Sequence, residues 1–176
     1  MITGFAKGHE KDTALVVPEG VTAIGEKAFY DCSSLTSIVL PESLTSIGAS
    51  AFEKCYYLTS VTMPKRLDDI GECAFHNCSR LTSITLPEGL TSIGRSVFSG
   101  CASLKSITLP QGLISLREDA FFACTSLTSI TLPDSLISIG SNAFHSCTGL
   151  KSITLPEGLT SFGVGAFAYC ESLTSI

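Results

Sequence analysis

Apolar residues recur along the chain in one fixed order, separated by short polar stretches. The same order returns every 23 residues, and seven prolines mark the period: Pro18, Pro41, Pro64, Pro87, Pro110, Pro133 and Pro156. In one repeat the apolar positions are Leu81, Ile84, Leu86, Leu90, Ile93, Val97, Phe98 and Cys101. A period of about 20–30 residues predicts a solenoid, because no single unit can bury its apolar face without its neighbours.

Each repeat predicts four short segments in a fixed order. Ile84-Thr85-Leu86 alternates as a strand does, and Pro87 must end that strand because it cannot donate to a ladder. Residues 90–93 then form an extended arm leading to Gly94. The pattern A-F-x-x-C that follows spaces its apolar residues as one helical turn does. We therefore expect an α/β solenoid with short parallel strands on a concave face and short helical or 3-10 turns on the convex face.

A glycine column closes each extended arm, at Gly25, Gly48, Gly71, Gly94, Gly140 and Gly163. It predicts either a positive φ or a close approach to the neighbouring repeat. Arg117 takes this place in the fifth repeat, which must therefore be strained or bend differently.

The repeats fill nearly the whole chain. Residues 1–16 are expected to form an N-terminal cap and the first strand, and residues 17–176 seven repeats in a single solenoid domain. His9 lies in the cap. Residues 173–176 end inside a predicted strand, so we expect a truncated array whose open C-terminal rung is able to pair with another copy.

Two ladders of identical residues are expected to build the core. One is Phe29, Phe52, Phe75, Phe98, Phe121, Phe144 and Phe167; the other is Cys32, Cys55, Cys78, Cys101, Cys124, Cys147 and Cys170. The thiols recur at one packing position, so we expect free, buried cysteines. Pairing between neighbouring repeats is the alternative that spacing leaves open. Cys73 occupies a polar column and is expected to be at least partly exposed.

Composition excludes several classes of function. The net charge is −5 and only 15% of residues are charged, which disfavours nucleic acid as a partner. No apolar run approaches the ~20 residues of a membrane span, so no membrane insertion is expected. Residues 1–20 lack the basic start and apolar stretch of a signal peptide, so any export signal is expected to lie outside this sequence.

Catalytic chemistry requires unlike groups brought together, whereas the special residues here either recur in each repeat or stand alone. His76 and His145 share a column but lie three repeats apart, too far to hold one metal ion. We expect His9, His76 and His145 to be exposed surface residues. We accordingly predict no catalytic residue, no cofactor and no metal site, and hence no enzyme.

The outward strand positions form columns of Ser and Thr, such as Ser83 with Thr85 and Ser106 with Thr108. They are interpreted as a merely soluble sheet face, as a contact surface for a protein or glycan, or as an ice-binding face. Residues that depart from the repeat are the best candidates for specific contacts, since the scaffold does not need them. These candidates are Tyr56, Tyr57, Arg80, Phe122, Lys105 and Lys151, with Phe122 expected to be exposed on the convex side.

The pattern L-x-x-I-x-L-P-x-x-L-x-x-I-G-x-x-A-F-x-x-C resembles the BspA-like leucine-rich repeat. That resemblance covers residues 15–176 and implies a right-handed leucine-rich-repeat solenoid in a bacterial protein that is secreted or displayed on the cell surface. It implies adhesion through binding of host, matrix or cell-surface proteins, or of a glycan. A structural spacer, a self-associating scaffold and a cytoplasmic interaction scaffold are the alternatives.

Overall fold

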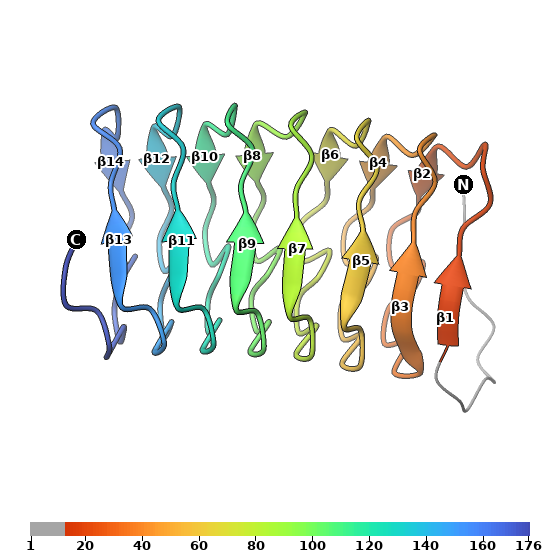
Figure 1. Ribbon diagram of the computed structural model, residues 1–176, viewed down its shortest axis with the longest axis horizontal. Coiled ribbons are helices and arrows are strands. Elements are labelled where there is room, and N and C mark those ends of the chain that lie inside the picture. The colour runs from red at the N-terminus through yellow and green to blue at the C-terminus, as the bar shows by residue number, and fades with distance from the viewer. Residues whose placement is uncertain (1–12) are drawn as a thin grey trace.

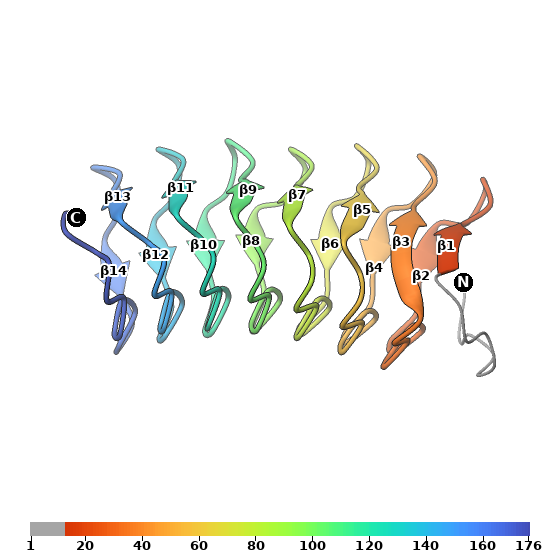
Figure 2. The same ribbon diagram turned by 60° about the horizontal axis from the view of Figure 1, so that its bottom comes forward.

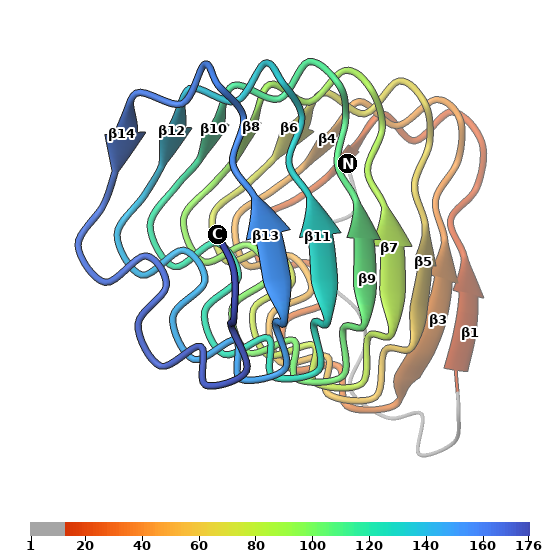
Figure 3. The same ribbon diagram turned by 60° about the vertical axis from the view of Figure 1, so that its left-hand side comes forward.

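The computed structural model describes residues 13–176, and the predicted cap residues, His9 among them, lie outside that range. The described chain winds into a solenoid whose strands form two facing rows (Figures 1 and 3). The first row contains β1 (Thr13–Val16), β3 (Leu35–Val39), β5 (Ser60–Thr62), β7 (Ser83–Thr85), β9 (Ser106–Thr108), β11 (Ser129–Thr131) and β13 (Ser152–Thr154). The second contains β2 (Ala23–Ile24), β4 (Ser46–Ile47), β6 (Asp69–Ile70), β8 (Ser92–Ile93), β10 (Ser115–Leu116), β12 (Ser138–Ile139) and β14 (Ser161–Phe162).

Each circuit of the solenoid, called a coil below, contributes one strand to each row. The third coil contains β5 and β6, and the fourth contains β7 and β8. The chain rises through the front row and descends through the back row while advancing from the N-terminus, which makes the winding right-handed (Figure 1). Neighbouring strands in a row are parallel, with Ser37 opposite Ser60 and Ser129 opposite Ser152. Equivalent residues therefore stand in columns.

The columns pointing inward form one continuous core. In the three-residue front strands only the middle side chain is buried, as at Ile84 and Ile107. The predicted phenylalanine ladder is confirmed: the rings stack nearly parallel, with centroids 5.1 Å apart between Phe29 and Phe52 and 5.7 Å apart between Phe75 and Phe98. Stacked rings bury large apolar areas, so this ladder is a major contributor to stability.

The predicted helical turns are wrong: no helix occurs in residues 13–176. The residue before each A-F-x-x-C segment and the residue before its cysteine have positive φ, for example Lys27 at 55° and Asp31 at 56°, which interrupts any helical run. The N–H groups alternate in their partners: Phe29 N donates to Ala51 O of the next coil, whereas Tyr30 N donates to Lys27 O within its own coil. Half of the N–H groups that a helix would use internally thus join neighbouring coils.

The predicted extended arm is a second strand. Ser92–Ile93 forms β8, and its equivalents in the other coils build the back row. A helical turn is wider than a strand, so helical turns on one face only would curve the stack and make the strand face concave. Because both faces carry strands, this cause of curvature is absent, and the coils in Figures 1 and 2 stand in a nearly straight row. The Ser and Thr columns therefore lie on the outer side of the front row rather than in a pronounced hollow.

The glycine column is explained by close approach and not by a positive φ. A Cβ on Gly48 would lie 2.6 Å from Glu26 N, and one on Gly140 would lie 2.6 Å from Arg117 C. Neither residue has a positive φ. Arg117, which does carry a Cβ at this position, is exposed, and the coils beside it are further apart, with Phe98 and Phe121 centroids separated by 5.6 Å.

Replacing Gly48 by Ala is expected to lower the free energy of unfolding by about 1–3 kcal/mol, because the new methyl group overlaps the backbone of the preceding coil. Gly94→Ala is the matched control. Its Cβ would meet nothing nearer than 3.4 Å, so we expect a change of less than about 1 kcal/mol. Urea unfolding followed by circular dichroism measures both, and equal losses would contradict this explanation of the column.

All eight cysteines are free, which confirms the prediction of unpaired thiols. Those of the central coils are buried, and Cys73 is half-buried as expected. Each ladder thiol from Cys55 onward donates a hydrogen bond to a phenylalanine carbonyl in the preceding coil, for example Cys101 Sγ to Phe75 O at 3.2 Å. Burial raises the pKa of Cys55, Cys101 and Cys147 to about 12.

Candidate functional site

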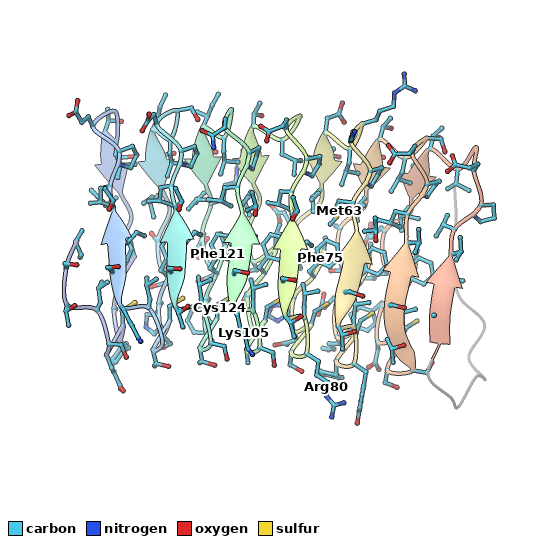
Figure 4. The ribbon with its side chains drawn as sticks, viewed as in Figure 1. Met63, Phe75, Arg80, Lys105, Phe121 and Cys124 are labelled. Carbon is cyan, nitrogen blue, oxygen red and sulfur yellow. The ribbon has the colours of Figure 1, made fainter. Side chains whose placement is uncertain are left out.

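An aromatic and cationic cluster lies at the lower corner of the second and third coils, where the chain turns into the front strands. Tyr57 and Arg80 are one period apart and therefore neighbours in one column. The Arg80 guanidinium lies over the Tyr57 ring, 4.2 Å from its centroid. Both side chains are exposed, and Figure 4 shows Arg80 projecting below the lower ends of the front strands. Stacking holds the guanidinium in place while leaving its N–H groups accessible.

Two further residues extend the cluster toward the N-terminus. The Lys54 ammonium donates a 2.6 Å hydrogen bond to the Tyr30 hydroxyl and lies 5.0 Å from the centre of that ring. This hydrogen bond raises the pKa of Lys54 above its ordinary value. Tyr30 and Tyr56 are each 38% exposed, and Tyr57 is 44% exposed. We call Tyr30, Lys54, Tyr56, Tyr57 and Arg80 the corner cluster.

Among residues 13–176, no carboxylate forms an ion pair with Arg80. Within residues 13–176 the ion pairs are Lys27 with Glu26 and Arg95 with Glu118. The guanidinium of the corner cluster is therefore stacked, exposed and uncompensated. Such a group is available to a carboxylate of a binding partner, which its planar fork binds with two hydrogen bonds.

Sequence reasoning identified part of this cluster. It selected Tyr57 and Arg80, whose side chains stack in the structure, and Tyr56, which precedes Tyr57 and is also exposed. It missed Tyr30 and Lys54, which are 24 residues apart and hence meet diagonally between neighbouring columns. A search of the repeat for aromatic and cationic residues one position off the period would have found them.

Phe122 belongs to a separate group in the C-terminal half, and the expectation that it is exposed is wrong. Its ring is half-buried and stacks on His145, with centroids 4.9 Å apart, and His145 in turn contacts Tyr169 at 4.9 Å. Phe122 and His145 are one period apart, so column stacking covers the surface that an isolated aromatic residue would expose.

His76 and His145 are also half-buried, so the expectation that both are exposed surface residues is wrong. His145 Nδ1 lies 2.8 Å from Ser146 Oγ, and His76 Nε2 lies 3.0 Å from Asn77 Nδ2. His76 Nδ1 is buried and makes no hydrogen bond. Neither imidazole contacts a carboxylate in these hydrogen bonds, and the hydroxyl beside His145 is that of its chain neighbour Ser146.

Lys105 and Lys151 are exposed and stand apart from the corner cluster in a threonine column. Thr59 of that column donates its hydroxyl to Thr36 O of the preceding coil at 2.9 Å, and Thr174 donates to Lys151 O at 3.2 Å. Lysine cannot replace the threonine hydroxyl in this contact with the same geometry. Lys105 and Lys151 therefore lack the hydroxyl that makes this hydrogen bond and carry an exposed charge at the same position.

No group of three or more His, Cys, Asp or Glu side chains in residues 13–176 is arranged to hold a metal ion. The same residues contain no helix of the length and apolarity that a membrane crossing requires.

The fold and the repeat define the class of protein. The BspA type leucine-rich repeat region matches residues 5–125 and 69–176 with six copies, and the chain belongs to this family. Among solved structures, a leucine-rich repeat protein of T. pallidum is 38% identical, with a TM-score of 0.87 over 92% of this chain and 78% of that one. Comparison with curated proteins gives no match.

Two more distant structures share the fold. The pneumococcal vaccine antigen PcpA is 22% identical with a TM-score of 0.68, covering 97% of this chain and 61% of that one. A leucine-rich cell surface protein of Faecalibacterium prausnitzii is 21% identical with a TM-score of 0.51, covering 94% of this chain and 87% of that one. These neighbours are bacterial leucine-rich repeat proteins.

Proposed function

We propose that this chain is a non-catalytic binding module of a bacterial surface protein, and that it recognises a protein partner through the corner cluster. The observation that carries the proposal is the exposed Arg80 guanidinium, stacked on Tyr57 and without an ion-pair partner in residues 13–176. Tyrosine and arginine contribute more than most residues to protein interfaces, and they do so most strongly when packing holds them in place.

Placement on the cell surface is supported by two structural neighbours, a leucine-rich cell surface protein and a pneumococcal vaccine antigen. Adhesion to host, matrix or cell-surface proteins is the role that fits such a location. The rigid row of coils would hold the corner cluster at a fixed angle, so that its aromatic rings need little ordering when a partner binds.

A binding screen tests this proposal. The purified protein is presented to immobilised matrix and host-surface proteins, and to a glycan array in parallel. Against any protein that binds, we expect the double variant Tyr57→Ala with Arg80→Ala to bind about 10- to 100-fold more weakly, because both anchors of the cluster are lost.

Arg66→Ala is the control, since Arg66 is exposed but makes no contact with an aromatic ring. It should bind as the parent protein does. Binding to glycans alone, or equal binding by the double variant and the control, would overturn the proposed protein-binding role of the corner cluster. Light scattering on the same samples shows whether self-association contributes.

A further inference from the structure

A groove crosses the back row of strands in the C-terminal half of the solenoid. Its floor is formed by β10, β12 and β14, which pair in register and stand side by side in Figure 3. The groove has a volume of about 680 Å³, and its lining extends from Glu72 in the third coil to Gly163 in the seventh. We call it the back groove.

Arg117 sets this part of the back row apart from the rest. Six coils have glycine at this position, and only the fifth has arginine. The Arg117 side chain is exposed and lines the back groove. No carboxylate of residues 13–176 forms an ion pair with it, whereas Nε of Arg95, the other arginine of the groove, lies 3.6 Å from Glu118 Oε2. The fifth coil thus places one uncompensated guanidinium in the groove, and its planar fork suits a carboxylate.

The two carboxylates of the back groove limit how much negative charge a ligand can carry. Glu118 is paired with Arg95, and Glu72 has no ion-pair partner within residues 13–176. Glu72 belongs to the third coil, two coils before Arg117, and would repel an acidic group placed beside it. The charges therefore fit a ligand that has a carboxylate at the fifth coil and neutral polar groups along the rest of the groove.

A row of serine hydroxyls follows the floor of the groove. Ser115, Ser138 and Ser161 lie opposite one another in register, one in each coil. Their hydroxyls have no hydrogen-bond partner within residues 13–176, whereas in the neighbouring threonine column Thr160 Oγ1 donates to Ile137 O at 3.2 Å. A hydroxyl both donates and accepts, as the hydroxyls of a neutral sugar do. The floor therefore offers a sugar one hydrogen-bonding group in each coil.

The spacing of the coils favours a saccharide over a peptide. Neighbouring phenylalanine rings of the fourth to seventh coils are 5.4–5.6 Å apart, and one pyranose unit of a linear chain advances by nearly this distance. An extended peptide instead rises about 3.4 Å per residue, so groups on one side of it recur about every 7 Å and do not follow the coils. β10 and β12 also have a paired strand on each side, which leaves no free backbone edge for a peptide to join there.

We propose that the back groove binds a linear acidic saccharide, with the carboxylate of one sugar unit on Arg117 and neutral units over Ser138 and Ser161. Chains in which uronic acid units alternate with neutral sugars have this chemistry. Ile114 and Ile137, which are 46% and 47% exposed, directly precede two serines of the floor and replace the threonine or aspartate of the other coils. Their side chains offer an apolar contact to the C–H face of a sugar ring.

This site is separate from the corner cluster and does not rest on its proposed role. The back groove lies on the back row, whereas Arg80 projects below the lower ends of the front strands (Figure 4). Arg80→Ala should leave saccharide binding unchanged, and Arg117→Gly should leave the binding of a protein at the corner cluster unchanged. Failure of one proposal is therefore distinguishable from failure of the other.

Isothermal titration calorimetry on the full chain, at one fixed ionic strength, tests the proposal. The first probe is a hexasaccharide of alternating glucuronate and N-acetylglucosamine, and the second is the same hexasaccharide with its carboxyl groups reduced to alcohols. A hexapeptide of alternating Glu and Ser is the third. We expect the acidic hexasaccharide to bind, and the reduced hexasaccharide and the peptide to bind at least about tenfold more weakly, because each lacks either the carboxylate or the spacing.

Two variants locate the site. Arg117→Gly introduces the residue that the other six coils carry, so it preserves the fold, and it should weaken the acidic hexasaccharide about tenfold while leaving the reduced one unaffected. Ser138→Tyr places a ring on the floor of the groove and should also weaken binding about tenfold. Ser46→Tyr, in the same column of the second coil and likewise half-buried, is the matched control and should bind as the parent protein does.

Four results would overturn the proposal. These are no binding of the acidic hexasaccharide at about 5 mM, equal affinity for its acidic and reduced forms, parental affinity in Arg117→Gly, and equal binding by Ser138→Tyr and Ser46→Tyr. Binding of the peptide as tightly as the acidic hexasaccharide would also contradict it, because the groove would then recognise acidic groups without regard to the sugar chain.

Discussion

Raising the pH from 7 to about 10 is expected to remove roughly 4 kcal/mol from the free energy of unfolding, because the buried thiols of Cys55, Cys101 and Cys147 keep their protons at that pH only in the folded state. The ordinary pKa of the thiol is 9.0, and burial raises the pKa of Cys55, Cys101 and Cys147 to about 12. The pKa values of Cys78 and Cys124 are also raised well above 9.0 by burial.

The direction of the effect follows from the order of proton release. Each folded-state pKa is raised, so stability is fully present below about pH 9 and is lost between pH 9 and 12, where the unfolded chain releases protons that the folded chain retains. One thiol contributes about 1.4 kcal/mol per pH unit in this range. Domains of ordinary stability have about 5–15 kcal/mol in total, so a large part of the stability should be lost near pH 10.

Urea unfolding at several pH values, in the presence of a reductant, measures this dependence. Cys101→Ala should flatten the alkaline slope by about 1.4 kcal/mol per pH unit, since one buried thiol is removed. Cys73→Ala is the control: its thiol is half-buried, and the slope should change less. A free energy of unfolding that stays constant up to about pH 10 would show that the ladder thiols are not shielded from water.

Phe98→Ala is expected to lower the free energy of unfolding by about 3–5 kcal/mol. Phe98 is fully buried and stacks between Phe75 and Phe121, so its removal leaves a cavity in the middle of the ladder. Because each coil contacts mainly its neighbours, the loss should also uncouple the two halves and broaden the unfolding transition.

Phe122→Ala is the matched control for this substitution. Phe122 is half-buried, and within residues 13–176 its ring stacks on one other ring, that of His145. Its expected cost is about 1 kcal/mol. Calorimetry and urea unfolding together measure both variants. Equal costs for Phe98 and Phe122 would mean that stability is not concentrated in the inward ladder.

The core was predictable because its columns are fixed by the period alone. Because all coils share one path, the Phe98 column is buried in six of the seven coils, and only Phe167 in the last coil is half-buried. The back row was not predictable from the same pattern. Leu90 and Ile93 are three residues apart, a spacing that does not distinguish an extended arm from a two-residue strand.

The error over the helical turns has a different cause. Lys27 and Asp31 adopt positive φ without being glycine, so no glycine in the sequence marks the left-handed backbone conformation at these two positions. Their conformation depends on hydrogen bonds to the next coil, such as that from Lys27 N to Ala49 O, which no local pattern encodes.

The corner cluster was partly predictable for the same geometric reason. Tyr57 and Arg80 share a column, and residues one period apart in a parallel stack are neighbours. Tyr30 and Lys54 are one residue out of register, so their contact depends on side-chain length and direction rather than on the period. The wider ring spacing beside Phe98 was not predictable, because valine in place of alanine at position 97 leaves the apolar pattern unchanged.

The alternating N–H ladder gives the chain a property that most folds lack. In the A-F-x-x-C turns the coils use equivalent donors and acceptors toward their neighbours, so removing or duplicating 23 residues within the array recreates an equivalent set of these bonds. An insertion of one residue would instead misalign every column that follows it within the coil. Genetic change in whole repeats therefore alters the length of the molecule, and the distance between its surface sites, without requiring a new core.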